Sequence, residues 1–130
     1  MNPVALDIKD LLEGESALGL SLGDNLFISV EPDQPDNTVT IYDTASPQPD
    51  STFDKLFYHR DMIQVRIRDN AYTDGFGRSM AIYEYLREIC NTEINGSYIT
   101  NITCTQPPHQ LKWDEQDRII IIINFEVQRR

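Results

Sequence analysis

Histidine is the side chain most often used for proton transfer near neutral pH, and this chain has two of them. His59 stands between Tyr58 and Arg60 near the start of an alternating segment, and His109 follows two prolines in a polar stretch. The chain has no G-x-S-x-G pattern, which would place a serine nucleophile on a sharp strand-to-helix turn. We therefore interpret both histidines as surface or packing residues and predict no catalytic group and no enzymatic activity.

Glycine and carboxylate patterns give no cofactor or metal signal. The glycine-rich turn DGFGRS at residues 74–79 lacks the third glycine of a dinucleotide fingerprint and the lysine of a phosphate loop. Several acids follow prolines, but neither Lys55 nor Lys112 has an acid two residues before it, as a metal-dependent nuclease would need. The acids also lack the glycine and the distal glutamate of a calcium loop. We predict no cofactor and no metal.

Cys90 and Cys104 are the only cysteines, and their spacing matches no metal or redox motif. The first residues, MNPVALDIKD, have neither the basic start nor the apolar stretch of a signal peptide. We therefore expect two reduced, buried thiols in a protein made in the cytoplasm.

The charge is distributed unevenly along the chain. Residues 1–54 hold 11 acids and one base, whereas residues 55–130 hold 10 of each, which gives a net charge of −10. A general nucleic-acid binder needs a basic stripe to displace counterions, and a surface that binds anionic lipid needs the same. No apolar run approaches the roughly 20 residues that span a bilayer. These observations exclude a general nucleic-acid binder and argue against a membrane protein.

The hydrophobic pattern predicts an α+β domain that covers residues 1–130. We expect a mostly antiparallel sheet of about five strands with two helices packed on it, in the order α-β-β-β-α-β-β. The bend EPDQPDN separates the first two strands, and long polar loops follow the second and fourth. The expected helices cover residues 3–13 and 72–90, and the expected strands cover residues 26–30, 38–42, 61–69, 97–104 and 118–128.

The second helix carries a broad apolar stripe that includes Phe76, Met80 and Leu86. Gly75 and Gly77 weaken helix formation near its start. The two glycines therefore indicate either close backbone packing or a later start of this helix.

Two strands carry the candidate contact residues. In DMIQVRIRD, Arg66 and Arg68 lie with Gln64 on the face opposite the apolar residues, and such a cationic face is ordinarily solvated. In the last strand, Ile120 and Ile122 make the second face apolar as well. A strand of this kind left open is an aggregation template, so we expect a helix or a neighbouring subunit to cover that face.

Three blocks, in order along the chain, resemble a known family. They are PDQPDNTVTIYDT at residues 32–44, IQVRIRD at 63–69 followed by Tyr72, and WDEQDRIIIIINFEV at 113–127 with Arg118 before the strand. Together they resemble the tail terminator proteins of long-tailed bacteriophages, also called minor capsid or tail completion proteins. Gly75 and Gly77 depart from the pattern, since relatives run a regular helix there.

The resemblance implies a small α+β subunit that forms a homohexameric ring and has no catalytic residues. The ring caps the tail tube, stops its polymerisation and offers a docking surface for the head completion or connector protein. DNA passes through the ring without specific binding. The protein would be part of the virion, at the tail–neck junction, and would be made in the cytoplasm of the host bacterium.

A head-to-tail ring uses two different patches on each subunit, and opposite local charge favours their register. We therefore predict subunit or partner contacts at Arg66, Arg68, Arg118, Ile120 and Ile122. Acids that line the hole would repel phosphate. The candidates for such channel-facing acids are Asp33, Asp36, Asp43, Asp50 and Asp54.

Two other functions stay open at this point. Another head–tail adaptor or neck protein would have a similar size and would also form a ring. An acidic inhibitor that mimics DNA would need a contiguous surface of regularly spaced carboxylates, whereas the acids here fall mainly in turns.

Overall fold

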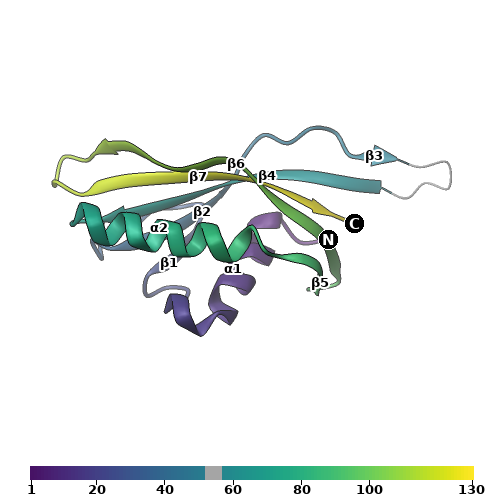
Figure 1. Ribbon diagram of the computed structural model, residues 1–130, viewed down its shortest axis with the longest axis horizontal. Coiled ribbons are helices and arrows are strands. Elements are labelled where there is room, and N and C mark those ends of the chain that lie inside the picture. The colour runs from purple at the N-terminus through teal and green to yellow at the C-terminus, as the bar shows by residue number, and fades with distance from the viewer. Residues whose placement is uncertain (52–56) are drawn as a thin grey trace.

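One curled sheet forms the frame of the molecule in the computed structural model, which describes residues 1–51 and 57–130 (Figure 1). The helices are α1 (Val4–Gly14), the short 3-10 helix η1 (Ser16–Leu18) and α2 (Tyr72–Leu86). The strands are β1 (Leu26–Ile28), β2 (Thr38–Asp43), β3 (Asp50–Ser51), β4 (Phe57–Asp69), β5 (Cys90–Ile94), β6 (Ser97–Trp113) and β7 (Ile119–Arg129).

The strands lie in the order β1-β2-β4-β7-β6-β5, and β3 pairs with the start of β4. All neighbours are antiparallel except β1 and β2, whose connection carries the chain back so that the two strands run parallel. The predicted α+β class and element order are confirmed, with the two short strands β3 and β5 added. The bend EPDQPDN is therefore part of a nine-residue connection between two parallel strands and does not close a hairpin.

The core lies between the sheet and the two helices, which pack on the same face (Figure 1). Alternate residues of β4 and β7 point into it, because side chains of a strand alternate between faces. The apolar face of α1, which consists of Val4, Ile8, Leu11 and Leu12, is buried against the sheet. The sheet part of the core contains Val39, Ile41, Ile63, Val65, Ile67, Ile119, Ile121, Ile123, Phe125 and Val127.

Helix α2 ends at Leu86, four residues before the predicted end, and its buried face consists of Gly75, Ser79, Ile82 and Leu86. A Cβ atom on Gly75 would lie 3.0 Å from the Cβ of Asp69, whereas Gly77 faces open space. The close packing predicted from the glycines is therefore confirmed at Gly75. Because glycine does not register as apolar, the pattern placed Phe76 inside, but its side chain is 38% exposed.

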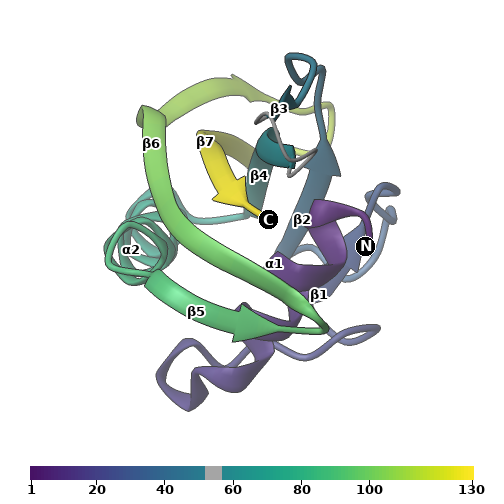
Figure 2. The same ribbon diagram turned by 90° about the vertical axis from the view of Figure 1, so that its right-hand side faces the viewer.

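Strand β6 is longer than predicted and replaces most of the expected second loop. It continues through the two prolines to Trp113, with several shifts in its register against β7. Figure 2, which looks along the sheet from one end, shows how strongly β6 curves while it stays paired with β7. Beyond Asn101, no strand among the described residues pairs with the outer edge of β6. Prolines fit there because a free edge needs no N–H donor.

The two cysteines are free thiols, with Cys104 half-buried and Cys90 exposed, so the expected burial of both is wrong for Cys90. Cys90 begins the edge strand β5, where one side of the strand faces solvent. Burial raises the pKa of the Cys104 thiol. Asn95 and Gly96 both have positive φ in the β5–β6 turn, as a tight hairpin requires.

Candidate functional site

The face of the sheet opposite the helices carries most of the predicted contact residues, and we call it the arginine face. It contains Gln64, Arg66 and Arg68 of β4 together with Ile120 and Ile122 of β7. Register places Arg66 beside Ile122 and Arg68 beside Ile120. On the other side of β7, His109 and Lys112 pair with the same two isoleucines.

Ile120 and Ile122 of the arginine face are covered by side chains of their own subunit. Ile120 is 3% exposed and Ile122 is 7% exposed, although neither belongs to the main core. Long side chains from both neighbouring strands flank them, and the aliphatic parts of such side chains cover apolar surface. The expected helix or neighbouring subunit is therefore not what buries them. A role for Ile120 and Ile122 in an interface stays a prediction.

Arg68 holds the loop between β1 and β2 against this face. Its side chain is 3% exposed, and its Nη1 lies 3.3 Å from Oε1 of Glu31. It donates hydrogen bonds to the carbonyl oxygens of Asp33 at 3.3 Å, Pro35 at 2.7 Å and Asp36 at 3.1 Å. A planar guanidinium suits this task because it offers five donors in fixed directions. Arg68 therefore uses its donors inside its own chain.

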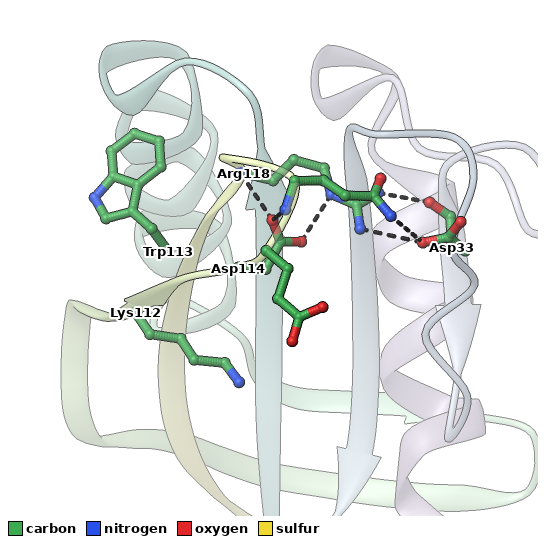
Figure 3. A pocket seen from close by; sticks show the side chains of 7 residues that line it. Asp33, Lys112, Trp113, Asp114 and Arg118 are labelled. Atoms are coloured by element: carbon green, nitrogen blue, oxygen red, sulfur yellow. Dashed lines mark hydrogen bonds and ion pairs between the residues drawn. The ribbon is translucent and has the colours of Figure 1, made fainter.

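Arg118 ties the same loop to the β6–β7 hairpin (Figure 3). Its Nε lies 2.7 Å from Oδ2 of Asp114, and its two terminal nitrogens lie 3.3 Å from carboxylate oxygens of Asp33 and Asp36. Nη1 also donates to the carbonyl oxygen of Asp33 at 2.5 Å. We call Arg118, Asp114, Asp33 and Asp36 the Arg118 clamp.

The electrostatics of the clamp hold Asp114 ionised. Burial raises the pKa of its carboxyl group, but hydrogen bonds from the backbone and guanidinium of Arg118 and from the backbone of Gln116 outweigh burial and lower that pKa. Beside the clamp lies a hollow of about 330 Å³, lined by Asp33, Lys112, Trp113, Asp114, Glu115, Gln116 and Arg118 (Figure 3).

Arg66 differs from the other two arginines, because part of its donor set has no partner. Its guanidinium carbon lies 5.3 Å above the ring of Tyr42, and its buried Nε makes no hydrogen bond. Burial and the neighbouring charge of Glu31 raise the pKa of Tyr42. Buried polar groups normally find a partner. Three more buried oxygens have no hydrogen-bond partner: Thr40 Oγ1, opposite Arg66 in the register, and Thr38 Oγ1 and Glu31 Oε2, whose residues lie beside Arg68.

The structure brings together two of the five predicted channel acids. Asp33 and Asp36 belong to the Arg118 clamp, although the Asp33 side chain is 72% exposed. Asp43 lies at the other end of β2, where its Oδ1 accepts a hydrogen bond from the backbone N–H of Ala5 in the first turn of α1. Asp50 begins β3, of which only the backbone is described, and Asp54 lies outside the described residues. Their orientation toward a channel stays a prediction.

A second buried arginine network lies at the far end of β7, and our interpretation of the sequence missed it. Arg129 is buried, with Nη1 at 2.8 Å from Oδ2 of Asp7 and Nε at 2.6 Å from Oδ2 of Asp61. A signal was present in the pattern, because Arg129 and Asp7 each occupy a core-facing position of their element. We call Arg129, Asp7 and Asp61 the Arg129 network.

Exposed aromatic side chains lie at the start of α2 and at the end of β6, and the sequence pattern gave no sign of their exposure. Tyr72 and Phe76 stack along the first turns of α2, with ring centroids 6.2 Å apart. Trp113 at the end of β6 is 45% exposed, and Leu111 two residues earlier is 46% exposed. Large apolar side chains left in solvent are a frequent mark of contact surfaces.

The part of the chain that the structure describes holds no group of three or more metal-ligating side chains. It also contains no helix that is both long and apolar enough to cross a membrane. The candidate site is a surface that consists of ion pairs and apolar side chains.

Comparison with known proteins matches this chain over nearly its whole length to one family. None of the curated proteins matches the chain. A chain in the solved structure of the virion of a native gene transfer agent (GTA) particle has a similar fold, with a TM-score of 0.70 and 12% sequence identity. The likeness covers 97% of this chain and 93% of that one. The family described as bacteriophage tail terminator protein matches residues 6–130, which confirms the resemblance found in the sequence. The chain therefore belongs to the bacteriophage tail terminator protein family.

Proposed function

We propose that this protein is a structural component of the phage virion that forms a ring on the tail tube. The ring ends polymerisation of the tube and joins the tail to the head completion or connector protein at the neck. The observation that carries this proposal is the match of the tail terminator family to residues 6–130. The protein would be made in the cytoplasm of the host bacterium and would act by binding, without catalysis.

The geometry supports an assembly role in two ways. Arg68 and the Arg118 clamp fix the loop over residues 31–37 and the β6–β7 hairpin, so these surfaces are ordered before any partner arrives. Ordering a loop in advance lowers the cost of association. Arg66 keeps a buried donor without a partner, and a neighbouring subunit that supplied an acceptor would satisfy it.

The acids of the first part of the chain would keep DNA moving through the ring. In this proposal Asp33, Asp36, Asp43, Asp50 and Asp54 face the hole, where they repel the phosphates of passing DNA. The domain would act as one unit over residues 1–130. The DNA-mimic alternative gains no support from the described residues, because Arg118 partly neutralises Asp33 and Asp36.

Electron microscopy of the purified chain mixed with its tail-tube protein tests the proposal. We expect tubes that carry a cap at one end and have a narrow length distribution. Tubes that stay uncapped at saturating protein would contradict it. A chain that leaves tubes unchanged but blocks a DNA-binding enzyme would favour the mimic instead, and a chain that binds only the head connector would favour another neck protein.

A further inference from the structure

The β5–β6 turn contains the only asparagine–glycine pair of the chain, Asn95 and Gly96. Both residues are exposed, and both have positive φ, as a two-residue hairpin turn requires. A Cβ atom on Gly96 would meet nothing within 4 Å, so the backbone of the turn is open to solvent. Strand β5 lies at one edge of the sheet, beside β6 (Figure 2). The turn is therefore at an exposed edge, where local opening of a fold costs least.

The side chain of Asn95 links this turn to α1. Its Nδ2 donates to Oδ2 of Asp10 at 2.6 Å and to Oδ1 of Asp7 at 3.1 Å. Asp7 is fully buried, and its other oxygen lies 2.8 Å from Nη1 of Arg129. Hydrogen bonds from Lys9 and from Asn95 lower the pKa of Asp10. One neutral amide therefore joins the turn to two carboxylates of α1 and completes the surroundings of the Arg129 network.

An asparagine that precedes glycine can lose its side-chain amide in water. The backbone nitrogen of the glycine attacks the side-chain carbonyl carbon, Cγ, and forms a new C–N bond. The bond between Cγ and Nδ2 breaks, and ammonia leaves with the proton from the glycine N–H. Water then opens the cyclic imide at either carbonyl, which leaves an aspartate or an isoaspartate. Glycine favours the attack because it has no side chain in the way and its backbone adopts many conformations.

The closed hairpin protects Asn95 from this reaction. In a turn with positive φ at both central residues, the nitrogen of Gly96 lies on the side of the Cα–C bond of Asn95 opposite its Cβ. The nitrogen cannot reach Cγ in that conformation. The two carboxylates of α1 also hold the amide in place. Attack therefore requires the hairpin to open first.

We propose that Asn95 is a site of spontaneous conversion to a carboxylate and that the conversion detaches the β5–β6 turn from α1. The reaction replaces the donor Nδ2 with an acceptor that carries the same charge as Asp7 and Asp10. Like charges at hydrogen-bond distance repel, and Asp7 is buried, where water and salt screen the repulsion least. The converted chain holds its hairpin less tightly. The reaction needs only water and this chain, so it is independent of the proposed function.

The rate of conversion tests how the fold controls this site. The natural chain is incubated in mildly alkaline buffer, once folded and once in denaturant, and peptide mass spectrometry follows each asparagine. We expect Asn95 to convert at least about tenfold more slowly in the folded chain, because the hairpin must open before the attack. Asn91, an exposed asparagine of β5 that precedes a threonine, is the control and should keep its amide over the same period. Equal rates in the two states, or no conversion of Asn95 in denaturant, would overturn the inference.

Three variants separate the new charge from the lost hydrogen bonds. Asn95→Asp supplies the carboxylate directly, and Asn95→Gly removes the side chain but keeps a residue that adopts positive φ. Asn91→Asp adds a carboxylate at an exposed position of the same strand, where φ is also positive. We expect Asn95→Asp to lower the midpoint of thermal unfolding by at least about 5 °C, and Asn91→Asp by about 1 °C or less. The loss for Asn95→Gly should lie between these two.

The comparison of the two Asn95 variants decides whether charge repulsion detaches the turn. An Asn95→Asp chain as stable as the Asn95→Gly chain would overturn that part of the inference. If the Asn95→Asp chain fails to fold while the Asn95→Gly chain folds, the result supports it.

Converted natural chain gives a second measurement that needs no substitution. Anion exchange separates it from the natural chain, because each conversion adds one negative charge. We expect it to unfold at or below the midpoint of the Asn95→Asp variant, since an isoaspartate also lengthens the backbone of the turn. Converted chain that unfolds at the same temperature as the natural chain would overturn the inference.

Discussion

The two ends of β7 both carry a buried arginine, but the two arginines bind different kinds of acid. Arg129 is paired with Asp7, which is fully buried on α1, and with Asp61 on the neighbouring strand. Arg118 is paired with Asp114 in its own hairpin and with two acids of a surface loop, one of them largely exposed. One network therefore joins secondary-structure elements, whereas the other shapes surface segments.

The difference indicates which end maintains the fold and which end shapes a surface. A buried charge that loses its partner is strongly destabilising, whereas an ion pair in contact with water contributes little. We therefore expect changes in the Arg129 network to lower the free energy of unfolding, and changes in the Arg118 clamp to act more on assembly.

The largest expected effect is at Asp7. Asp7→Ala leaves Arg129 buried with one carboxylate fewer and removes an acceptor for the side chain of Asn95. We expect a loss of about 3–5 kcal/mol in the free energy of unfolding, measured by chemical denaturation. Asp10→Ala, a partly exposed position on the same helix, is the control and should cost about 1 kcal/mol or less. A loss at Asp7 no larger than at Asp10 would contradict the comparison.

A substitution at Gly75 tests whether close packing of α2 against the sheet stabilises the fold independently of the Arg118 clamp. Gly75→Ala forces a methyl group to within 3.0 Å of the Cβ of Asp69, near Ile119 and Ile121. We expect a loss of about 1–3 kcal/mol in the free energy of unfolding.

The control for this variant lies one half-turn along the same helix. Gly77→Ala meets open space and should be neutral or stabilising by up to about 1 kcal/mol. Thermal unfolding of both variants measures the difference, and equal effects would show that the close approach at Gly75 is unimportant.

The contribution of the Arg118 clamp to stability should depend on pH. Because the pKa of Asp114 is lowered in the folded chain from its ordinary value of 3.8, its ionised form stabilises the fold above that value. We expect Asp114→Asn to cost about 1–2 kcal/mol at pH 7, as for a hydrogen bond to a charged group.

The difference between this variant and the natural chain should shrink as the pH falls below 3.8 through the folded pKa. Denaturation curves between pH 7 and pH 3 provide the measurement. A difference that stays constant across this range would show that the charge of Asp114 is not the cause.

The smallest effect on stability is expected at Arg66. Arg66→Gln removes a charge above the Tyr42 ring and should change the free energy of unfolding by about 0.5–1 kcal/mol. If Arg66 faces a neighbour, association should weaken, and more so at low salt, because salt screens exposed charges. Sedimentation at two ionic strengths measures this, and unchanged association at low salt would remove Arg66 from the interface.

The sequence predicted the elements that hydrophobic periodicity controls. The apolar faces of α1, β4 and β7 follow simple repeats, and the structure places them as expected. The pattern missed β5 and the second half of β6, because edge strands with prolines and polar residues have no clear alternation. It also misplaced the buried face of α2, since that face is built around Gly75 and Ser79.

The candidate contact residues were harder to place, because the pattern gives the face of a residue but not its partners. Alternation put Arg66 and Arg68 on the same face, yet only the fold of the β1–β2 loop determines that Arg68 is buried beneath it. The burial of Ile122 likewise depends on neighbours across the sheet. A charged residue at Ile122 would therefore destabilise the subunit itself, so it could not test an interface there by itself.

The growth of tail tubes tests most directly whether this protein ends tube polymerisation. Purified chain is added to polymerising tail-tube protein at a ratio of one ring per tube, and tube lengths are measured by electron microscopy over time. We expect elongation to stop on addition of the chain and the tube lengths to stay constant afterwards. Tubes that continue to lengthen at the same rate in the presence of excess chain would contradict it.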